Sequence, residues 1–546
     1  MMTIDFKTPK AVALTASLIC LLVYLRALAC DFVNFDDTFY VLNSEAIRQL
    51  DWNLVVYAFT APQANWVPLT HISLAIDYHF WELNPIGYHL TNILLHSANT
   101  GLVVLIADGL YRNKFSENGT VAGGKYLYPG MLLLAALVFG IHPLRVESVA
   151  WVTERKDVLN GIFSLGSIYF YLRYVDKKIE RGPTSAAKRN LLISVSLFFL
   201  SLIAKTMSVT VPVLLLVIDW YPLRRVKNFK EFLQLVVEKI PYFVLSAAVA
   251  ILMLSKTSKV KVLLTLDQFP FESRIIVSGN AVFEYIRLQL LPFGISPLPF
   301  IPSPIPWTYT VKTVLVLLIT AGILFYWKKC RWLTAAWCCF VIALVPILAL
   351  FQANPMSLAA HGTYLPSVFP GIILAALSAQ TYCKFAASSS QFLGKMMLCA
   401  AVTLLVFYVA MTQLHIGVWK DSEALWTRVI KIQPFDRAYF SRALHYVDVG
   451  RYQDAIDDYT VCLRFMTVDR DPEAFNINAF RGEALAKIGR YEDAVRDFTT
   501  AIGQYPHRLY YYHRGRALKE LGRTGEAEAD FRQAGQAKGQ MYWFGR

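Results

Sequence analysis

Two adjacent carboxylates follow the first apolar run of the chain. Asp36 and Asp37 end the sequence DFVNFDD, and neighbouring side chains on an extended or turning backbone point in different directions. One carboxylate can take a proton from an acceptor hydroxyl while the other holds the fold. At a lipid surface, desolvation raises a carboxyl pKa toward the useful range. We interpret the pair as candidate catalytic groups, with solvated loop acids or a helix cap as the alternative.

A second concentration of charge is HPLRVESVAWVTERKDVLN, residues 142–160, between two apolar runs. Glu147 and Glu154 are seven residues apart and would share one face of a continuous helix. Arg155 is a candidate phosphate ligand. Solvation explains some of this charge, but the segment is a candidate substrate site, with these members: His142, Glu147, Glu154 and Asp157.

Aromatic and histidine side chains are dense between residues 31 and 89. Trp66 and His89 are candidate substrate contacts, because aromatic rings stack on sugars, although aromatic residues are also ordinary membrane anchors. His89, Asn92 and His96 follow one helix face. Hydrogen bonds between helices are at least as good an explanation of this face.

Two cations stand where the membrane does not favour them. Lys205 lies on the expected outer side, against the positive-inside rule. Arg287 lies in the apolar segment 275–293, where a guanidinium can bind a lipid phosphate in bidentate fashion. Snorkelling toward the interface is the alternative for Arg287.

Long apolar runs must position these residues. Of 546 residues, 55% are hydrophobic and 17% charged, which is more apolar than a soluble domain. We predict about eleven membrane spans in an all-α chain. Their ranges are 11–30, 90–111, 127–142, 157–175, 191–205, 207–221, 239–255, 311–327, 332–352, 363–383 and 396–416.

Short basic loops set the predicted orientation. The net charge is +14, and most Lys and Arg residues cluster between apolar runs, which favours a cytoplasmic leaflet over nucleic acid. Lys125 belongs to the first of these loops. The first external loop, 31–89, then faces outward. Counting 275–293 as a span would misplace the later basic loop, so we predict an amphipathic surface helix there.

The polar residues 417–546 contain a repeat. Arg442, Arg481 and Arg514 begin equivalent helices, and the last two are 33 residues apart. An insertion near residues 467–472 lengthens the first spacing. The period is close to the roughly 34 residues of tetratricopeptide repeats, so we predict a helical solenoid that binds peptides or proteins. We therefore expect two domains, a membrane domain of residues 1–416 and a repeat domain of residues 417–546.

The eight cysteines are scattered, so neither a disulfide framework nor a zinc site is expected. The first apolar run resembles a signal peptide, but its length favours an uncleaved span. A loose lipoprotein box at Cys30 is the less favoured alternative.

Several stretches, in this order, resemble the transmembrane and tetratricopeptide-repeat O-mannosyltransferases and their bacterial relatives. These are DFVNFDD, WVPLTHISLAIDYHFWELNPIGYHLTNILLHSANT, HPLRVESVAWVTERKDVL, AKTMSVTVPVLLLVIDWYPL, YIRLQLLP and TYLPS. The resemblance implies a GT-C membrane fold and a polyprenyl- or dolichyl-phosphate sugar donor. It also implies an acidic residue of the first external loop near the acceptor (Asp36 or Asp37) and a basic residue of the surface helix on the donor phosphate (Arg287). One departure is His361, which stands where the family commonly has Arg.

The predicted function is therefore transfer of a lipid-linked sugar to a hydroxyl, most simply of protein Ser or Thr. The phosphate ligands would be Arg287, Lys205, Arg155 and His361. A non-enzymatic scaffold or a transporter is the alternative. We predict no cofactor and no metal site, while a need for a divalent metal stays open. Expected partners are membrane lipid, the donor and a protein acceptor, and no nucleic acid. The expected location is a bacterial inner membrane with periplasmic repeats, or an endoplasmic-reticulum membrane in a eukaryote.

Overall fold

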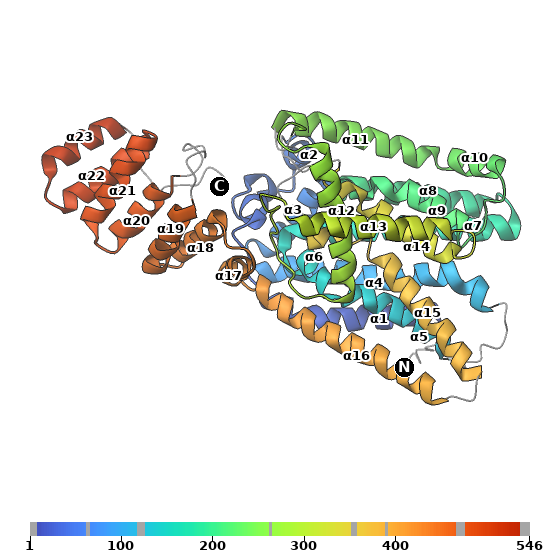
Figure 1. Cartoon of the computed structure of the whole chain (residues 1–546). Helices are drawn as coiled ribbons and strands as arrows, with labels where there is room; N and C mark the ends of the chain where they lie inside the picture. Colours follow the sequence, from blue (N-terminus) through green and yellow to red (C-terminus); the bar gives the residue numbers. More distant parts are fainter. Residues whose placement is uncertain are drawn as a thin grey trace, which may run out of the picture. The chain divides into compact units, whose positions relative to one another are not determined.

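A computed structural model describes residues 8–61, 66–116, 126–260, 265–350, 358–387, 391–465 and 476–535. These parts are helical, with no strand among them, which confirms the all-α prediction (Figure 1). Lys125 and the insertion predicted near residues 467–472 lie outside the described residues. The chain divides into two units: unit 1 comprises Met1–Cys30 and Glu45–Gly417, and unit 2 comprises Asp31–Ser44 and Val418–Arg546.

Unit 1 contains the long apolar helices. They are α1 (Pro9–Tyr24), α2 (Trp52–Thr60), α3 (Pro68–Trp81), α4 (Pro85–Ser116), α5 (Leu127–Gly140), α6 (Val146–Ala150), α7 (Arg155–Arg181), α8 (Ser185–Ala204), α9 (Val211–Trp220), α10 (Phe229–Glu238), α11 (Ile240–Val260), α12 (Phe271–Leu290), α13 (Trp307–Phe325), α14 (Arg331–Leu344), α15 (Val368–Ala387) and α16 (Gln391–Ile416). Each of the eleven predicted apolar runs overlaps a helix, and the predicted surface segment is α12.

Fewer helices than the predicted eleven are long and apolar enough to count as membrane spans. Among the described residues, five helices are long and apolar enough to cross a bilayer, or seven if two bent helix pairs each count as one span. The number eleven therefore stays a prediction. One bent pair joins α5 to the short helices that end at Ala150, with a bend of 49°. In the apolar stretches of α13 and α16 only 11% of the residues are buried, so most of the surface of these two helices is left to contact lipid.

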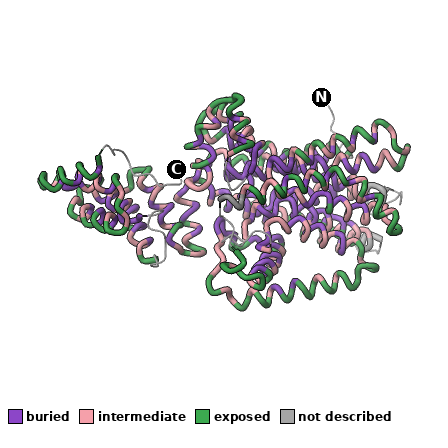
Figure 2. The backbone as a smooth tube through the Cα atoms, turned by 90° about the horizontal axis from the view of Figure 1, so that it is seen from above, coloured by how far each residue is buried: buried purple, intermediate pink, exposed green. Residues whose placement is uncertain are grey.

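The interior of unit 1 is formed by helices from distant parts of the sequence. Helix α4 packs against α1, α5 and α7, α7 packs against α8, and α15 packs against α5. Figure 2 shows buried positions concentrated in the interior of the helical bundle and exposed positions along its outer helices. Gly140 is one point of close approach, since a Cβ there would lie 2.5 Å from Oγ1 of Thr100. This packing holds the charged segment after α5 away from bulk water.

Unit 2 is a stack of helix pairs. Its helices are α17 (Ser422–Ile432), α18 (Asp436–Asp448), α19 (Tyr452–Phe465), α20 (Ile477–Lys487), α21 (Tyr491–Gln504), α22 (Arg508–Glu520) and α23 (Thr524–Ala534). Figure 1 shows the pairs following one another from α18 to α23. Gly450, Gly489 and Gly522 lie in the turn between the two helices of a repeat and have φ between +74° and +78°, the left-handed region that glycine accepts without strain.

The repeat arginines form a ladder inside this stack. Arg481 donates from Nε and Nη2 to the carboxylate of Asp497 at 2.7 and 2.8 Å, and from Nη1 to Thr460 of the preceding pair at 3.1 Å. Equivalent contacts recur one repeat earlier and one repeat later, at Arg442 and Arg514. Each arginine thus ties the two helices of one repeat to the helix that precedes the repeat.

Candidate active site

The charged segment after α5 is a series of short helices. The chain passes from η4 (Pro143–Arg145) through α6 and η5 (Val152–Glu154) into α7. The expectation that Glu147 and Glu154 share one continuous helix face is wrong, because Trp151 has an extended backbone (φ −85°, ψ 118°) that separates their helices. The two carboxylates nevertheless meet at one partner, His361.

His361 lies in η8 (Ala360–Thr363), more than two hundred residues further along the chain. Its Nδ1 makes a very short contact with Oε1 of Glu147, and its Nε2 is 3.8 Å from Oε1 of Glu154. The side chain is 21% exposed, while those of Glu147 and Glu154 are 3% and 1% exposed. The predicted site residues Glu147 and Glu154 therefore form one cluster with His361, the residue at which this sequence differs from the family pattern.

Two lysines complete this cluster. Nζ of Lys205, at the C-terminal end of α8, lies 2.6 Å from Oδ1 of Asp157 and 3.1 Å from Oε2 of Glu154. Nζ of Lys156 lies 2.8 Å from Oε1 of Glu154. The unexpected outer-side cation is thus the counter-ion of two buried carboxylates. We call the six side chains the charged cluster: Glu147, Glu154, Lys156, Asp157, Lys205 and His361.

Neighbouring charges decide the protonation states of the cluster. Burial raises the pKa of Glu154, but His361, Lys156 and Lys205 outweigh burial and hold this pKa well below the ordinary value. Burial lowers the pKa of His361, but the charges of Glu154 and Glu147 outweigh it and raise this pKa above 6.5. A protonated His361 carries its positive charge between the carboxyl groups of Glu147 and Glu154. Oε2 of Glu147 has no hydrogen-bond partner among the described residues, so it can accept from a ligand hydroxyl.

Arg155 is engaged inside the protein. Its guanidinium is fully buried and donates to Asp77 at 2.5 Å, Ser73 at 2.9 Å, the carbonyl of Tyr88 at 2.8 Å, and Asn92. These contacts join α7 to α3 and α4. Such a geometry explains Arg155 as a structural link, and it leaves Lys205 and His361 as the better placed phosphate candidates of unit 1.

Three further candidates are also buried in structural contacts. His142 accepts from the backbone N–H of Leu144 at Nδ1, so its Nε2 donates to the carbonyl of Gln289 at 3.1 Å. Trp66 is 7% exposed and donates to the carbonyl of Phe59 at 3.1 Å. His89 is fully buried in α4. The hydrogen bonds of His142 and Trp66 hold their own loops in place, which distinguishes these two side chains from the charged cluster.

Arg287 is the most exposed of the predicted phosphate ligands. Its side chain is 37% exposed, and it donates to Glu284 at 2.6 Å and to the carbonyl of Phe293 at 3.1 Å. Lys312 lies 2.7 Å from the same Glu284. Because Arg287 and Lys312 are partly exposed, an anion can approach them and replace part of their contact with Glu284. Arg155 is fully buried and does not allow such an approach.

Sequence reasoning missed Arg145 as a site residue. Its side chain is fully buried, donates from Nη2 to Thr363 and lies 5.5 Å from the ring centre of Tyr364. Nε and Nη1 have no hydrogen-bond partner within the described part of the chain. The only signal in the sequence is a cation within the HPLR motif, since its partners lie in the TYLPS motif over two hundred residues away.

The acidic pair belongs to unit 2. Asp37 is 1% exposed, and its Oδ2 accepts from the backbone N–H of Val33 at 3.1 Å. Asp36 is only partly buried, and its charge acts on Arg437 at the start of α18. Burial lowers the pKa of Arg437, and Asp36 opposes that shift. The two carboxylates therefore differ: Asp37 holds the local fold, and Asp36 can be reached.

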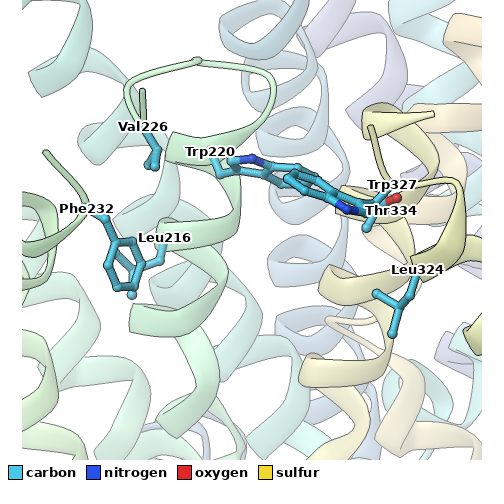
Figure 3. A pocket seen from close by; sticks show the side chains of 7 residues that line it. All are labelled: Leu216, Trp220, Val226, Phe232, Leu324, Trp327 and Thr334. Carbon is cyan, nitrogen blue, oxygen red and sulfur yellow. The ribbon is translucent and has the colours of Figure 1, made fainter. Parts of the chain in front are cut away.

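Two other features bear on ligand binding. Across the described ranges, no group of three or more His, Cys, Asp or Glu side chains is arranged to hold a metal ion. A cavity of about 490 Å³ lies among α9, α10, α13 and α14, and Figure 3 shows Trp220 and Trp327 facing each other beside it. No titratable side chain lines this cavity, so we place no chemistry there.

Comparison with known proteins agrees with this architecture. Residues 468–540 match the family model of the tetratricopeptide repeat. Protein O-mannosyl-transferase TMTC4 of Homo sapiens is 26% identical over 346 residues, which cover 61% of this chain and 42% of that protein. Protein O-mannosyl-transferase tmtc2 of Xenopus laevis is 30% identical over 169 residues, covering 30% and 18%. The chain thus matches less than half the length of these curated relatives. It is a relative of the transmembrane and tetratricopeptide-repeat O-mannosyltransferases.

Proposed function

We propose that the chain is a GT-C-type membrane transferase that moves a sugar from a polyprenyl- or dolichyl-phosphate donor to a protein Ser or Thr hydroxyl. The main support is the charged cluster, a buried site in which His361 contacts Glu147 and lies beside Glu154, although these residues come from separate sequence motifs. Buried charge of this kind is costly and marks functional sites. The names of the relatives favour mannose as the sugar and protein as the acceptor.

The proposed step is an inverting displacement. A carboxylate of the first loop takes the proton of the acceptor hydroxyl, and the hydroxyl oxygen forms a bond to the anomeric carbon. The bond between that carbon and the phosphate oxygen breaks, and the lipid phosphate leaves with the electron pair. We assign the proton transfer to Asp36, because Asp37 is buried and accepts a backbone N–H.

Donor recognition needs cations and hydroxyl acceptors. We assign the phosphate to Arg287, with Lys205 and a protonated His361 as further positive groups. Glu147, with one oxygen atom unpartnered among the described residues, is assigned to a sugar hydroxyl. The repeats would bind the acceptor protein. The location we propose is a bacterial inner membrane with the repeats in the periplasm, or the lumenal face of an endoplasmic-reticulum membrane.

A kinetic comparison of variants tests these assignments. Purified full chain is given labelled polyprenyl-phosphate mannose and a Ser/Thr peptide. Arg287→Gln should raise the donor KM about tenfold, and Asp36→Asn should lower kcat at least about hundredfold with donor KM unchanged. Asp51→Asn, at the exposed cap of α2, is the matched control and should behave as wild type. Full activity of Asp36→Asn would remove the proposed base, and a chain without any transfer would favour the scaffold or transporter.

A further inference from the structure

The segment that contains the acidic pair is built into the repeat unit. Asp31–Ser44 belongs to unit 2, although in sequence it directly follows the first apolar helix. Its first residue, Asp31, donates its backbone N–H to the carbonyl of Lys420 at 2.8 Å. The division predicted from composition assigned these residues to the membrane domain.

Asn34 makes three hydrogen bonds of this attachment. Its backbone N–H donates to Oγ of Ser422 at 2.9 Å, and its Nδ2 donates to the carbonyl of Ser441 at 2.7 Å. Its Oδ1 accepts from Nε1 of Trp426 at 2.6 Å. The partners lie on α17 and on α18, the first helix of the first repeat. One side chain therefore joins the loop to two helices at once.

An apolar contact fixes the same point. The ring of Phe35 meets the ring of Trp426 edge-on, with centroids 5.7 Å apart, and Trp426 is 1% exposed. Asp36 follows Phe35 directly, and its charge acts on Arg437 of α18. Two residues of chain reach about 7 Å at most, so the Asn34 contacts limit how far Asp36 can move from the first repeat helix.

We infer that Asn34 is a positioning residue that holds the reacting carboxylate on the first repeat helix, so that the repeats orient Asp36 as well as dock the acceptor. The inference rests on the proposed transferase function. An acceptor that bends or straightens the first repeat would then move the carboxylate with it, which couples acceptor binding to the chemical step. A misplacement of about 1 Å can lower a rate about hundredfold, so even a small loosening should be measurable.

The test uses the full chain and two separate readouts. Asn34→Ala removes both side-chain hydrogen bonds, and Trp426→Phe removes one of them while keeping a ring against Phe35. Hydrogen exchange of residues 31–44 reports the attachment without any assay of activity. Steady-state kinetics report kcat and donor KM. Asn53→Ala, at an exposed asparagine of α2, is the matched control.

Asn34→Ala should speed exchange in 31–44 and lower kcat about 10- to 100-fold, with donor KM within about twofold of wild type. Trp426→Phe should lie between Asn34→Ala and wild type in both readouts, and Asn53→Ala should change neither. Wild-type exchange and kcat in Asn34→Ala would overturn the inference, as would a change confined to donor KM. If Asn34→Ala does not fold, unchanged readouts in Trp426→Phe would overturn it. A wild-type chain without transfer would reject the proposed function, and the exchange readout would still decide whether Asn34 holds the loop.

Discussion

Lys205 offers a direct test of the charged cluster. Its Nζ lies 2.6 Å from Oδ1 of Asp157 and 3.1 Å from Oε2 of Glu154, and the three side chains are 13%, 3% and 1% exposed. Removing one partner of a buried ion pair costs about 3–5 kcal/mol. Glu154 would keep Lys156 at 2.8 Å, so only Asp157 loses its salt-bridge partner. We therefore expect Lys205→Met to cost about 3 kcal/mol, the lower end of that range.

Unfolding of the full chain in mixed detergent micelles, with SDS as denaturant, measures this cost. Lys230→Met changes an exposed lysine of α10 and should stay within about 0.5 kcal/mol of wild type. Adding Asp157→Asn to Lys205→Met removes the stranded charge and should restore about 1–2 kcal/mol. Equal stabilities of Lys205→Met and Lys230→Met, with no coupling in the double variant, would refute the ion pairs.

Three further predictions concern His361 and the repeats. Because the pKa of His361 is raised in the folded state, the stabilisation from its protonated form is complete below pH 6.5 and is lost as pH rises through the folded pKa. The melting temperature of His361→Gln should therefore depend less on pH above 6.5 than that of wild type. His361→Arg places a permanent cation beside Glu154 and should lower the donor KM about tenfold, which an unchanged KM would contradict. Gly515→Ala should cost about 1–3 kcal/mol in the same unfolding assay, because its Cβ would lie 2.9 Å from the Phe531 ring. Gly525→Ala meets nothing within 4 Å inside α23 and should stabilise slightly; the opposite order would contradict the packing.

Much of the fold follows from local patterns. Each predicted apolar run coincides with a helix because length and hydrophobicity are local properties. The repeat is visible in the sequence because Arg442, Arg481 and Arg514 recur at similar spacings. The structure shows the reason, since the same arginine contacts and the same left-handed turn recur in each repeat. Local patterns do not give the number of spans, because the count among the described helices depends on whether each of two bent helix pairs crosses the bilayer as one span.

The site was harder to predict because it depends on tertiary partners. Glu147, Glu154 and Lys205 were found as unusual charges, but their meeting with His361 needs contacts across more than two hundred residues. Arg155 reads as a phosphate ligand until Asp77, 78 residues away, is seen to neutralise it. The break at Trp151 has no strong sequence signal, since no glycine or proline marks it.

The membership of the acidic segment was likewise hidden. Composition changes at about residue 417, which suggests that everything before it is membrane domain. Hydrogen bonds between Asn34 and the helices α17 and α18 join residues about four hundred positions apart, and no period or hydropathy pattern encodes them. The sequence does not distinguish Asp36 from Asp37, whereas the structure shows that Asp37 is buried and Asp36 is half-buried.

Mass analysis of an acceptor peptide tests the central claim most directly. Purified chain in detergent is incubated with polyprenyl-phosphate mannose and a Ser/Thr-rich peptide, beside Asp36→Asn that has been shown to melt as wild type does. We expect the mass of one hexose on a Ser or Thr of the peptide with wild type, and unmodified peptide with Asp36→Asn. Unmodified peptide from wild type with both polyprenyl and dolichyl donors, or equal modification by the two proteins, would contradict the account.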